Sequence, residues 1–340
     1  MKLRKWIAAL LAGTMCAGML VGCGKFTPIN AEKEDEAYQG EIMLILPKKD
    51  EYLSYLQHAA QAAAEARGCE LDVVDCNEDQ DKEIEYVTAA VNEGAPVIII
   101  ALADNTRAQD VVDAAGDVPV VFVNRTPADR SVLDDTHIHI GSDEEECGAY
   151  QGKVLVDYLK EKGKDSVNYL MFNGNEGQDS TIKRTAGVLK AMKDAGITAT
   201  PAAEPIDCHY DRTEAMNAMN RMLAEDVDME NIDIIISNND SMACGAMEAL
   251  RQAEVDLTDI AVVGVDGTNS GIQAVADGEM LATVYQNATG QASAAVQAAV
   301  NLANGKSFAE GISYDADENN ASIIWVPFEL ITADNVEDYR

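Results

Sequence analysis

The strongest constraint on this chain is its alternation of short apolar runs with amphipathic stretches. The runs at residues 98–100 and 120–123 contain only Ile, Val and Phe, without the polar alternation of a strand that is exposed on one face. Amphipathic stretches at residues 52–66, 82–91 and 106–115 separate such runs. Buried strands separated by helices predict a parallel sheet with helices on both faces.

The same alternation restarts after residue 141 and predicts a second lobe of this kind. Its predicted strands and helices occupy residues 167–171, 183–195, 197–202, 213–224, 232–237, 242–252 and 260–265. The remaining chain adds a strand at 281–285, an Ala-rich helix at 291–304 and a strand at 322–326, but no third core. We therefore expect an α/β fold of two doubly wound parallel-sheet lobes, with the tail completing the first lobe.

One helix start is marked by Ser142 and Glu145. This spacing predicts a capping box, in which each side chain accepts a hydrogen bond from the backbone amide of the other residue. Asp143 and Glu144 would place negative charge at the positive end of a helix that runs to about Lys162.

The first residues indicate export. Lys2, Arg4 and Lys5 precede an apolar run at residues 6–21, the pattern of a secretory signal peptide. Residues 20–23, Leu-Val-Gly-Cys, resemble the lipobox of bacterial lipoproteins, in which cleavage before the Cys leaves a lipid-modified N-terminus. We expect a lipoprotein signal peptide at 1–22, lipid on Cys23, and a polar linker at 23–40 that tethers the folded chain to the outer face of the cytoplasmic membrane.

Composition excludes one class of partner. The chain carries 59 acidic and 25 basic side chains, a formal net charge of −34, so a nucleic acid would be repelled. Five cysteines remain after the signal and Cys23 are set aside, and an odd number cannot all pair. We expect mostly free, buried thiols at Cys69, Cys76, Cys147, Cys208 and Cys244.

Polar residues gather where the predicted strands end. In open parallel sheets, ligands bind beyond the carboxyl ends of the strands. Carboxylates, carboxamides and aromatic rings dominate these positions, and such groups suit a ligand with many hydroxyls. The segments concerned are 48–52, 124–125, 173–178, 209–211, 238–240, 266 and 286–287.

Residues 233–250, followed by Val-Val-Gly-Val-Asp-Gly at 262–267, give the chain a specific likeness. This core resembles that of the type I periplasmic sugar-binding proteins of ATP-binding-cassette (ABC) importers, in particular their galactose/glucose-binding members. The likeness extends from Glu41 to about Val336 and includes the phrases at 120–124, 141–143 and 283–292. It implies lobes at 41–141 plus 288–324 and at 143–286 plus 327–340, joined by a three-segment hinge near 141–142, 286–287 and 325–329.

The resemblance also implies a pocket. Asp50 and Tyr52 match the acid and the aromatic of the first loop, and Asn124 matches the carboxamide of the first lobe. In the second lobe, Arg184, Asn239 and Asp266 match further hydroxyl-binding groups. Tyr210 stands where the family usually has a Trp, and Gln286 where it has an Asn. Gln178 and Ser180 replace a ligand-binding His and Asp, which changes the hydroxyl pattern that the site prefers.

Each of these residues also has a purely structural interpretation. Asp50, Asn124 and Asn239 could be helix caps or turn residues. Tyr52 and Tyr210 could be core aromatics, and Arg184 could pair with a neighbouring acid. His137 and His139 share one strand face without a third ligand nearby, so we expect no metal there. The calcium loop of some relatives is absent from residues 160–167, and no cofactor is expected.

The function that the resemblance implies is capture of a monosaccharide, a hexose such as galactose or glucose, and its delivery by a monomeric protein to an ABC transporter permease. A sensor that reports sugar occupancy to a chemoreceptor or histidine kinase would share the pocket and differ in its partner. An exported hydrolase is the weaker alternative, because the sequence has neither a GxSxG nor an HExxH motif. We therefore expect a binding protein and not an enzyme.

Overall fold

The computed structural model describes residues 40–225 and 228–340, which belong to one compact unit of residues 37–340. The predicted signal peptide, Cys23 and all of the predicted linker except Gly40 lie outside the described residues.

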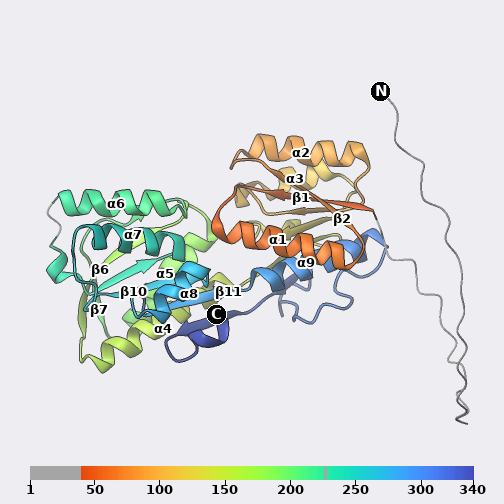
Figure 1. The fold of residues 1–340 in the computed structure, drawn as a ribbon. Coiled ribbons are helices and arrows are strands. Elements are labelled where there is room, and N and C mark those ends of the chain that lie inside the picture. The colour runs from red at the N-terminus through yellow and green to blue at the C-terminus, as the bar shows by residue number, and fades with distance from the viewer. Residues whose placement is uncertain (1–39, 226–227) are drawn as a thin grey trace, which may run out of the picture. The chain divides into compact units, whose positions relative to one another are not determined.

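The first lobe is built on a six-stranded sheet with the order β12-β5-β4-β3-β1-β2 (Figure 1). All of its neighbouring strands are parallel. Its strands are β1 (Glu41–Leu46), β2 (Glu70–Asp75), β3 (Ile98–Ile100), β4 (Val120–Val123), β5 (His137–Gly141) and β12 (Ile323–Trp325). Its helices are α1 (Glu51–Ala66), α2 (Gln80–Glu93), α3 (Ala108–Ala115) and α9 (Ala288–Ala303), with 3-10 turns at Asn105–Arg107 and Arg130–Val132.

The second lobe is built on a seven-stranded sheet with the order β13-β11-β10-β9-β6-β7, in which β8 also pairs with β6. Its strands are β6 (Ser166–Asn173), β7 (Thr198–Pro201), β8 (Ile206–Asp207), β9 (Ile234–Ser237), β10 (Ala261–Asp266), β11 (Ala282–Gln286) and β13 (Phe328–Thr332). Its helices are α4 (Glu144–Glu161), α5 (Asp179–Asp194), α6 (Arg212–Ala224), α7 (Asp240–Gln252) and α8 (Asn269–Ala276), with 3-10 turns at Met229–Asn231 and Val336–Tyr339.

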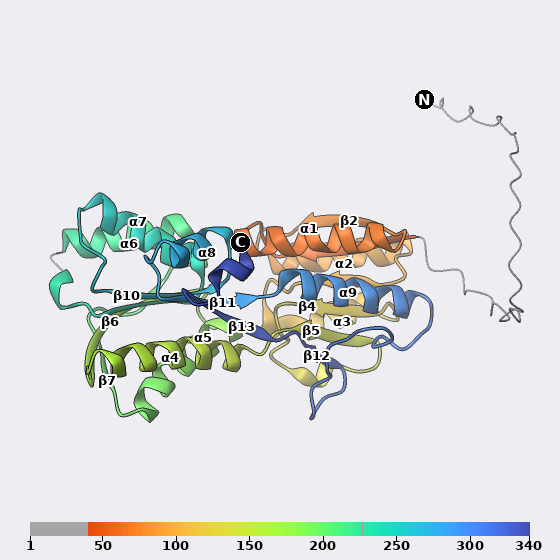
Figure 2. The ribbon, with the colours of Figure 1, turned by 60° about the horizontal axis from the view of Figure 1, so that its bottom comes forward.

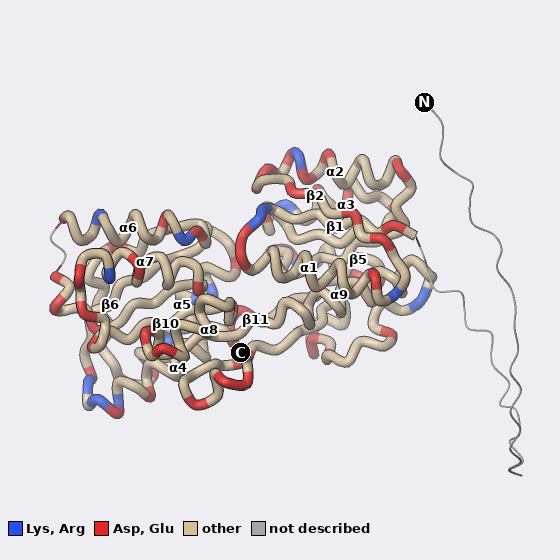
Figure 3. Tube along the Cα trace, in the orientation of Figure 1, with Lys and Arg blue, Asp and Glu red and all other residues tan. Residues whose placement is uncertain are grey.

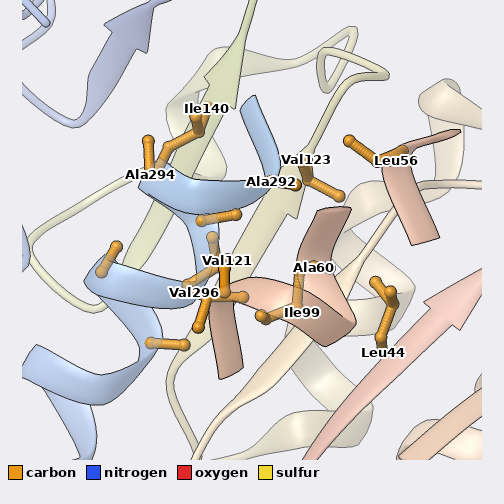
Figure 4. Packing of buried hydrophobic residues seen from close by; sticks show 14 of the residues in the cluster. Leu44, Leu56, Ala60, Ile99, Val121, Val123, Ile140, Ala292, Ala294 and Val296 are labelled. Atoms are coloured by element: carbon orange, nitrogen blue, oxygen red, sulfur yellow. The ribbon is translucent and has the colours of Figure 1, made fainter. Parts of the chain in front are cut away.

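The first core shows why its strands lack polar alternation. Ile99 packs on one face of the sheet with residues of α1 and α9, which lie side by side (Figures 1 and 2). Ile98 and Ile100 pack on the other face with residues of α2 and α3. Small side chains such as Ala292 bring α9 close to the sheet (Figure 4). Because both faces are covered, the central strands β3 and β4 are apolar at every position.

The chain passes between the lobes three times: after β5, after β11, and between β12 and β13. The expected fold class, two parallel-sheet α/β lobes, is therefore confirmed, with one addition. Strand β13 runs antiparallel to β11 and closes the edge of the second sheet. The sequence patterns used above predicted neither β13 nor helix α8.

The predicted start of α4 is wrong in detail. Asp143, not Ser142, caps the helix, because its side chain accepts from the amide of Glu145 at 3.0 Å. Ser142 instead accepts a hydrogen bond from Gln291 of α9 at 2.8 Å. The hydrogen bond between Ser142 and Gln291 thus connects the first crossing with α9, the helix that follows the second crossing.

Helices α4 and α5 approach each other through glycines. A Cβ atom built on Gly148 would lie 2.8 Å from the carbonyl oxygen of Arg184 and 2.9 Å from the Cα atom of Gly187. Arg184, which makes this contact through its backbone, also lines the cavity described below. Backbone packing therefore determines where the Arg184 side chain begins.

We expect Gly148→Ala to lower the free energy of unfolding by about 1–3 kcal/mol, because a buried methyl group would force the two helix backbones apart. Urea unfolding followed by circular dichroism measures this change. The control is Ala149→Ser, which also adds one atom but at the exposed neighbouring position, and should stay within about 0.5 kcal/mol of the parent. Equal stability of Gly148→Ala and the parent would contradict the packing.

Candidate functional site

The ten residues expected at the site line one cavity between the two lobes. Asp50, Tyr52 and Asn124 come from the first lobe, and Gln286 lies at the second crossing. The second lobe contributes Gln178, Ser180, Arg184, Tyr210, Asn239 and Asp266. Most of them lie at or just after the carboxyl end of a strand, as the geometry of parallel sheets requires.

Asp50 and Tyr52 are positioned by the start of α1. Asp50 caps the helix, with one carboxylate oxygen accepting from the amide of Leu53 at 2.7 Å. Burial raises the pKa of Asp50 above its ordinary value. Tyr52 is 7% exposed, and its buried hydroxyl has no hydrogen-bond partner. Capping and cavity lining are therefore compatible roles for Asp50, and Tyr52 presents an unpaired polar atom at the same place.

Three lining residues have left-handed backbones. The φ angles are 65° at Asn124, 59° at Tyr210 and 107° at Asp266. Non-glycine residues rarely adopt such values, which cost free energy and concentrate at functional sites. In Asp266 the conformation ends β10 and leaves the carboxylate facing the cavity, where it is 6% exposed.

The Tyr210 ring is held from two sides. Its hydroxyl lies 2.7 Å from the Ser180 hydroxyl and 2.8 Å from the Thr181 hydroxyl. Gln178 in turn donates to Ser180 at 2.9 Å. A Cβ atom at Gly174 would fall 2.0 Å from the ring, so the aromatic packs directly on that backbone. Gln178 and Ser180, which replace a His and an Asp of the family pattern, thus form a neutral network around the tyrosine.

Each guanidinium nitrogen of Arg184 donates one hydrogen bond within the protein. Its Nε and Nη2 atoms donate to the two carboxylate oxygens of Glu144 at 2.6 and 2.9 Å, and Nη1 donates to the carbonyl of Asn238 at 2.8 Å. Both side chains are nearly completely buried, at 4% and 6% exposure. A buried bidentate ion pair of this kind fixes the orientation of both side chains. Arg184 therefore pairs with an acid, Glu144, as its structural interpretation expected, and it also lines the cavity.

Asn239 and Gln286 complete the polar wall. The Asn239 side chain caps α7 by accepting from the amide of Met242 at 2.9 Å. Gln286 is 2% exposed, and its buried Nε2 atom has no hydrogen-bond partner. An unpaired buried donor costs free energy unless a bound group accepts from it.

Six further residues line the cavity: Leu53, Asn105, Arg125, Thr126, Glu144 and Asp179. Arg125 belongs to the strand-end segment 124–125 given above but was not among the ten expected site residues, and Thr126 directly follows it. Glu144 was interpreted as a charge in the first turn of a helix, and its partner Arg184, 40 residues away, left no local signal.

Polar contacts join the lobes around the cavity. Lys48 donates to the carbonyl of His209 at 2.7 Å, and Asn175 donates to Glu78 at 3.1 Å. Ser241 donates to the Glu51 carboxylate at 2.9 Å. The lobes are therefore in contact on the rim, and the cavity is bounded by both of them.

Other chemical candidates lie away from this cavity. The five cysteines Cys69, Cys76, Cys147, Cys208 and Cys244 are all buried. His139 is buried beside Thr126 and Trp325, and burial lowers its pKa to about 3. In residues 40–225 and 228–340 no cluster of three metal-ligating side chains occurs. None of the helices described there is long and apolar enough to cross a membrane.

Comparison with known proteins gives the same family. The model of the periplasmic binding protein domain matches residues 42–307. A putative rhizopine-binding protein of Rhizobium meliloti is 26% identical over 80% of this chain and 83% of its own length. The D-galactose/methyl-galactoside binding periplasmic protein of Haemophilus influenzae is 26% identical over 85% and 88%.

A solved structure shares the fold. The solute binding protein of an ABC transporter from Bacillus halodurans, with bound myo-inositol, superimposes with a TM-score of 0.76 at 27% identity, covering 90% of this chain and 98% of that one. These relatives are substrate-binding proteins and not enzymes, which sets the exported hydrolase aside. The chain belongs to the periplasmic binding protein family, as a type I sugar-binding protein of the kind that serves ABC importers.

Proposed function

We propose that this chain is a lipid-anchored, monomeric binding protein that captures a monosaccharide between its lobes and delivers it to an ABC transporter permease. A hexose such as galactose or glucose is the first candidate for the ligand. The observation that carries this proposal is a cavity lined by both lobes, in which the buried Tyr52 hydroxyl and the Gln286 Nε2 atom have no hydrogen-bond partner among the described residues.

The cavity offers hydroxyl groups both donors and acceptors. Tyr52 and Gln286 can donate, while Asp50 and Asp266 can accept from neighbouring hydroxyls of one ring. Tyr52 and Tyr210 supply apolar ring surface from opposite lobes. A ligand that satisfies groups of both lobes stabilises the closed arrangement over an open one, and the three crossings are the segments about which the lobes would move.

The relatives' names support a polyhydroxylated ligand without specifying which one. Their names specify a rhizopine, a galactoside and myo-inositol, and Gln178 and Ser180 depart from the galactose/glucose pattern. The first experiment is therefore isothermal titration of residues 32–340 with galactose, glucose, xylose, ribose, arabinose and myo-inositol. Tight one-to-one binding of one compound supports capture, and its loss in Asp266→Ala places the compound in the cavity. Absence of binding to all six contradicts the sugar assignment.

Tyr52→Phe separates binding from folding. The Tyr52 hydroxyl has no hydrogen-bond partner among the described residues, so its removal should leave the melting temperature unchanged or raise it. If the hydroxyl contacts the ligand, the dissociation constant should rise about three- to tenfold, corresponding to one lost neutral hydrogen bond.

The matched control is Tyr86→Phe on α2, which makes the same change in the same lobe away from the cavity and should leave the dissociation constant unchanged. A Tyr52→Phe protein that binds as tightly as the parent would show that this hydroxyl does not contact the ligand.

The anchor is tested separately. We propose the signal peptide at 1–22, lipid on Cys23, the linker at 23–40 and the two lobes with the boundaries given above. Cys23→Ala should move the protein from the membrane fraction to the soluble extracytoplasmic fraction, because lipidation supplies the attachment. Cys69→Ala, which removes a thiol of the folded part, should leave the distribution unchanged. Retention of Cys23→Ala in washed membranes would contradict the lipid anchor.

A further inference from the structure

The positive charges that line the cavity are already compensated by the protein. Arg184 is held by Glu144 and by the carbonyl of Asn238, as described above. Arg125 donates to the carbonyls of Leu102 and Ala103 at 2.9 and 3.2 Å and to Glu78 at 3.3 Å. Both guanidinium groups are thereby used in holding the walls of the cavity together.

Two of the lining carboxylates are compensated much less well. The Asp266 carboxylate accepts no hydrogen bond from the described residues, and the nearest cationic atom, Nη1 of Arg184, is 3.8 Å away. Asp50 accepts only from the amide of Leu53, and Lys48 lies 4.0 Å from its other oxygen. Lys48 is closer to Glu78, at 3.5 Å. Asp179, by contrast, is paired with Lys183 at 2.9 Å.

The surroundings of Asp266 disfavour the charged form of its carboxyl group. Burial raises the pKa of Asp266 well above its ordinary value, and the nearby Asp240 and Asp50 add to this effect, although Arg184 opposes it. The surrounding protein strengthens the negative field, since Asp and Glu are spread over both lobes (Figure 3) and the chain has a net charge of −34. A cation bound beside Asp266 would favour the charged carboxylate again, because it supplies the opposite charge that offsets burial.

We propose that the ligand of this cavity is an amino-substituted polyol, a sugar or cyclitol ring that carries one ammonium group bound between Asp50 and Asp266. This inference rests on the proposed capture of a polyhydroxylated ring and specifies its charge. The ammonium group supplies the donors that Asp266 lacks, while ring hydroxyls pair with Tyr52 and Gln286. Carboxylated or phosphorylated sugars are excluded, because no uncompensated cation faces the cavity from the described residues.

The test compares ligands that differ only in charge. Residues 32–340 are titrated calorimetrically at pH 7 with glucose and glucosamine, galactose and galactosamine, myo-inositol and an aminodeoxy-inositol, and with glucuronate. At least one amino compound should bind ten or more times tighter than its neutral parent, and glucuronate should give no detectable heat. Asp266→Asn keeps the shape of the side chain but removes its charge, so the ratio should fall to within about threefold of one.

The control for overall charge is Asp157→Asn on α4, an exposed carboxylate paired with Lys153, which should leave the ratio within twofold of the parent value. A melting curve confirms that each variant is folded, and the comparison in the unsubstituted protein stands without any variant. Neutral rings that bind as tightly as every amino form would overturn the charge assignment and leave sugar capture intact. If no ring of either kind binds, sugar capture itself fails.

Discussion

The burial of parallel strands on both faces is the constraint on which this structure depends. Strands such as β3 have no polar positions because helices cover the sheet on both sides. Many of the polar groups of the interior therefore lie at the strand ends, and all parallel strands of a sheet end at the same edge. The two sheets bring these edges to opposite walls of one cavity, so the site is a consequence of the topology.

Two residues of the cavity wall, Asp50 and Asn239, are also helix caps. Asp50 and Asn239 cap helices with one side-chain oxygen, and this hydrogen bond holds the remaining polar atom in place at the cavity. Capping thus prepares the binding geometry before a ligand arrives. At these two positions, helix capping and cavity lining are compatible, so the structural interpretation does not exclude the proposed binding role.

Charge compensation sets the character of the cavity. The Glu144–Arg184 pair gives Arg184 a fixed orientation, and Glu78 with two backbone carbonyls does the same for Arg125. Groups of the protein already neutralise much of the charge of each arginine. The nearest cationic atom to the Asp266 carboxylate, Nη1 of Arg184, is 3.8 Å away. The ligand preference of such a cavity depends on which charges the wall has already paired, and a list of lining residues alone does not contain that information.

The sequence by itself determined the α/β class, the two lobes and the ten lining residues, because strand burial, strand ends and family phrases are local patterns that a linear chain displays. It predicted neither β13, in which only Phe328 and Ile331 are buried and the pattern of a strand is weak, nor the cap at Asp143. Only the tertiary structure decided that Glu144 meets Arg184, that the Tyr52 and Gln286 atoms lack partners, and that Asp266 stays poorly compensated. These facts depend on distances between residues far apart in the chain, and periodicity and spacing carry no record of such distances.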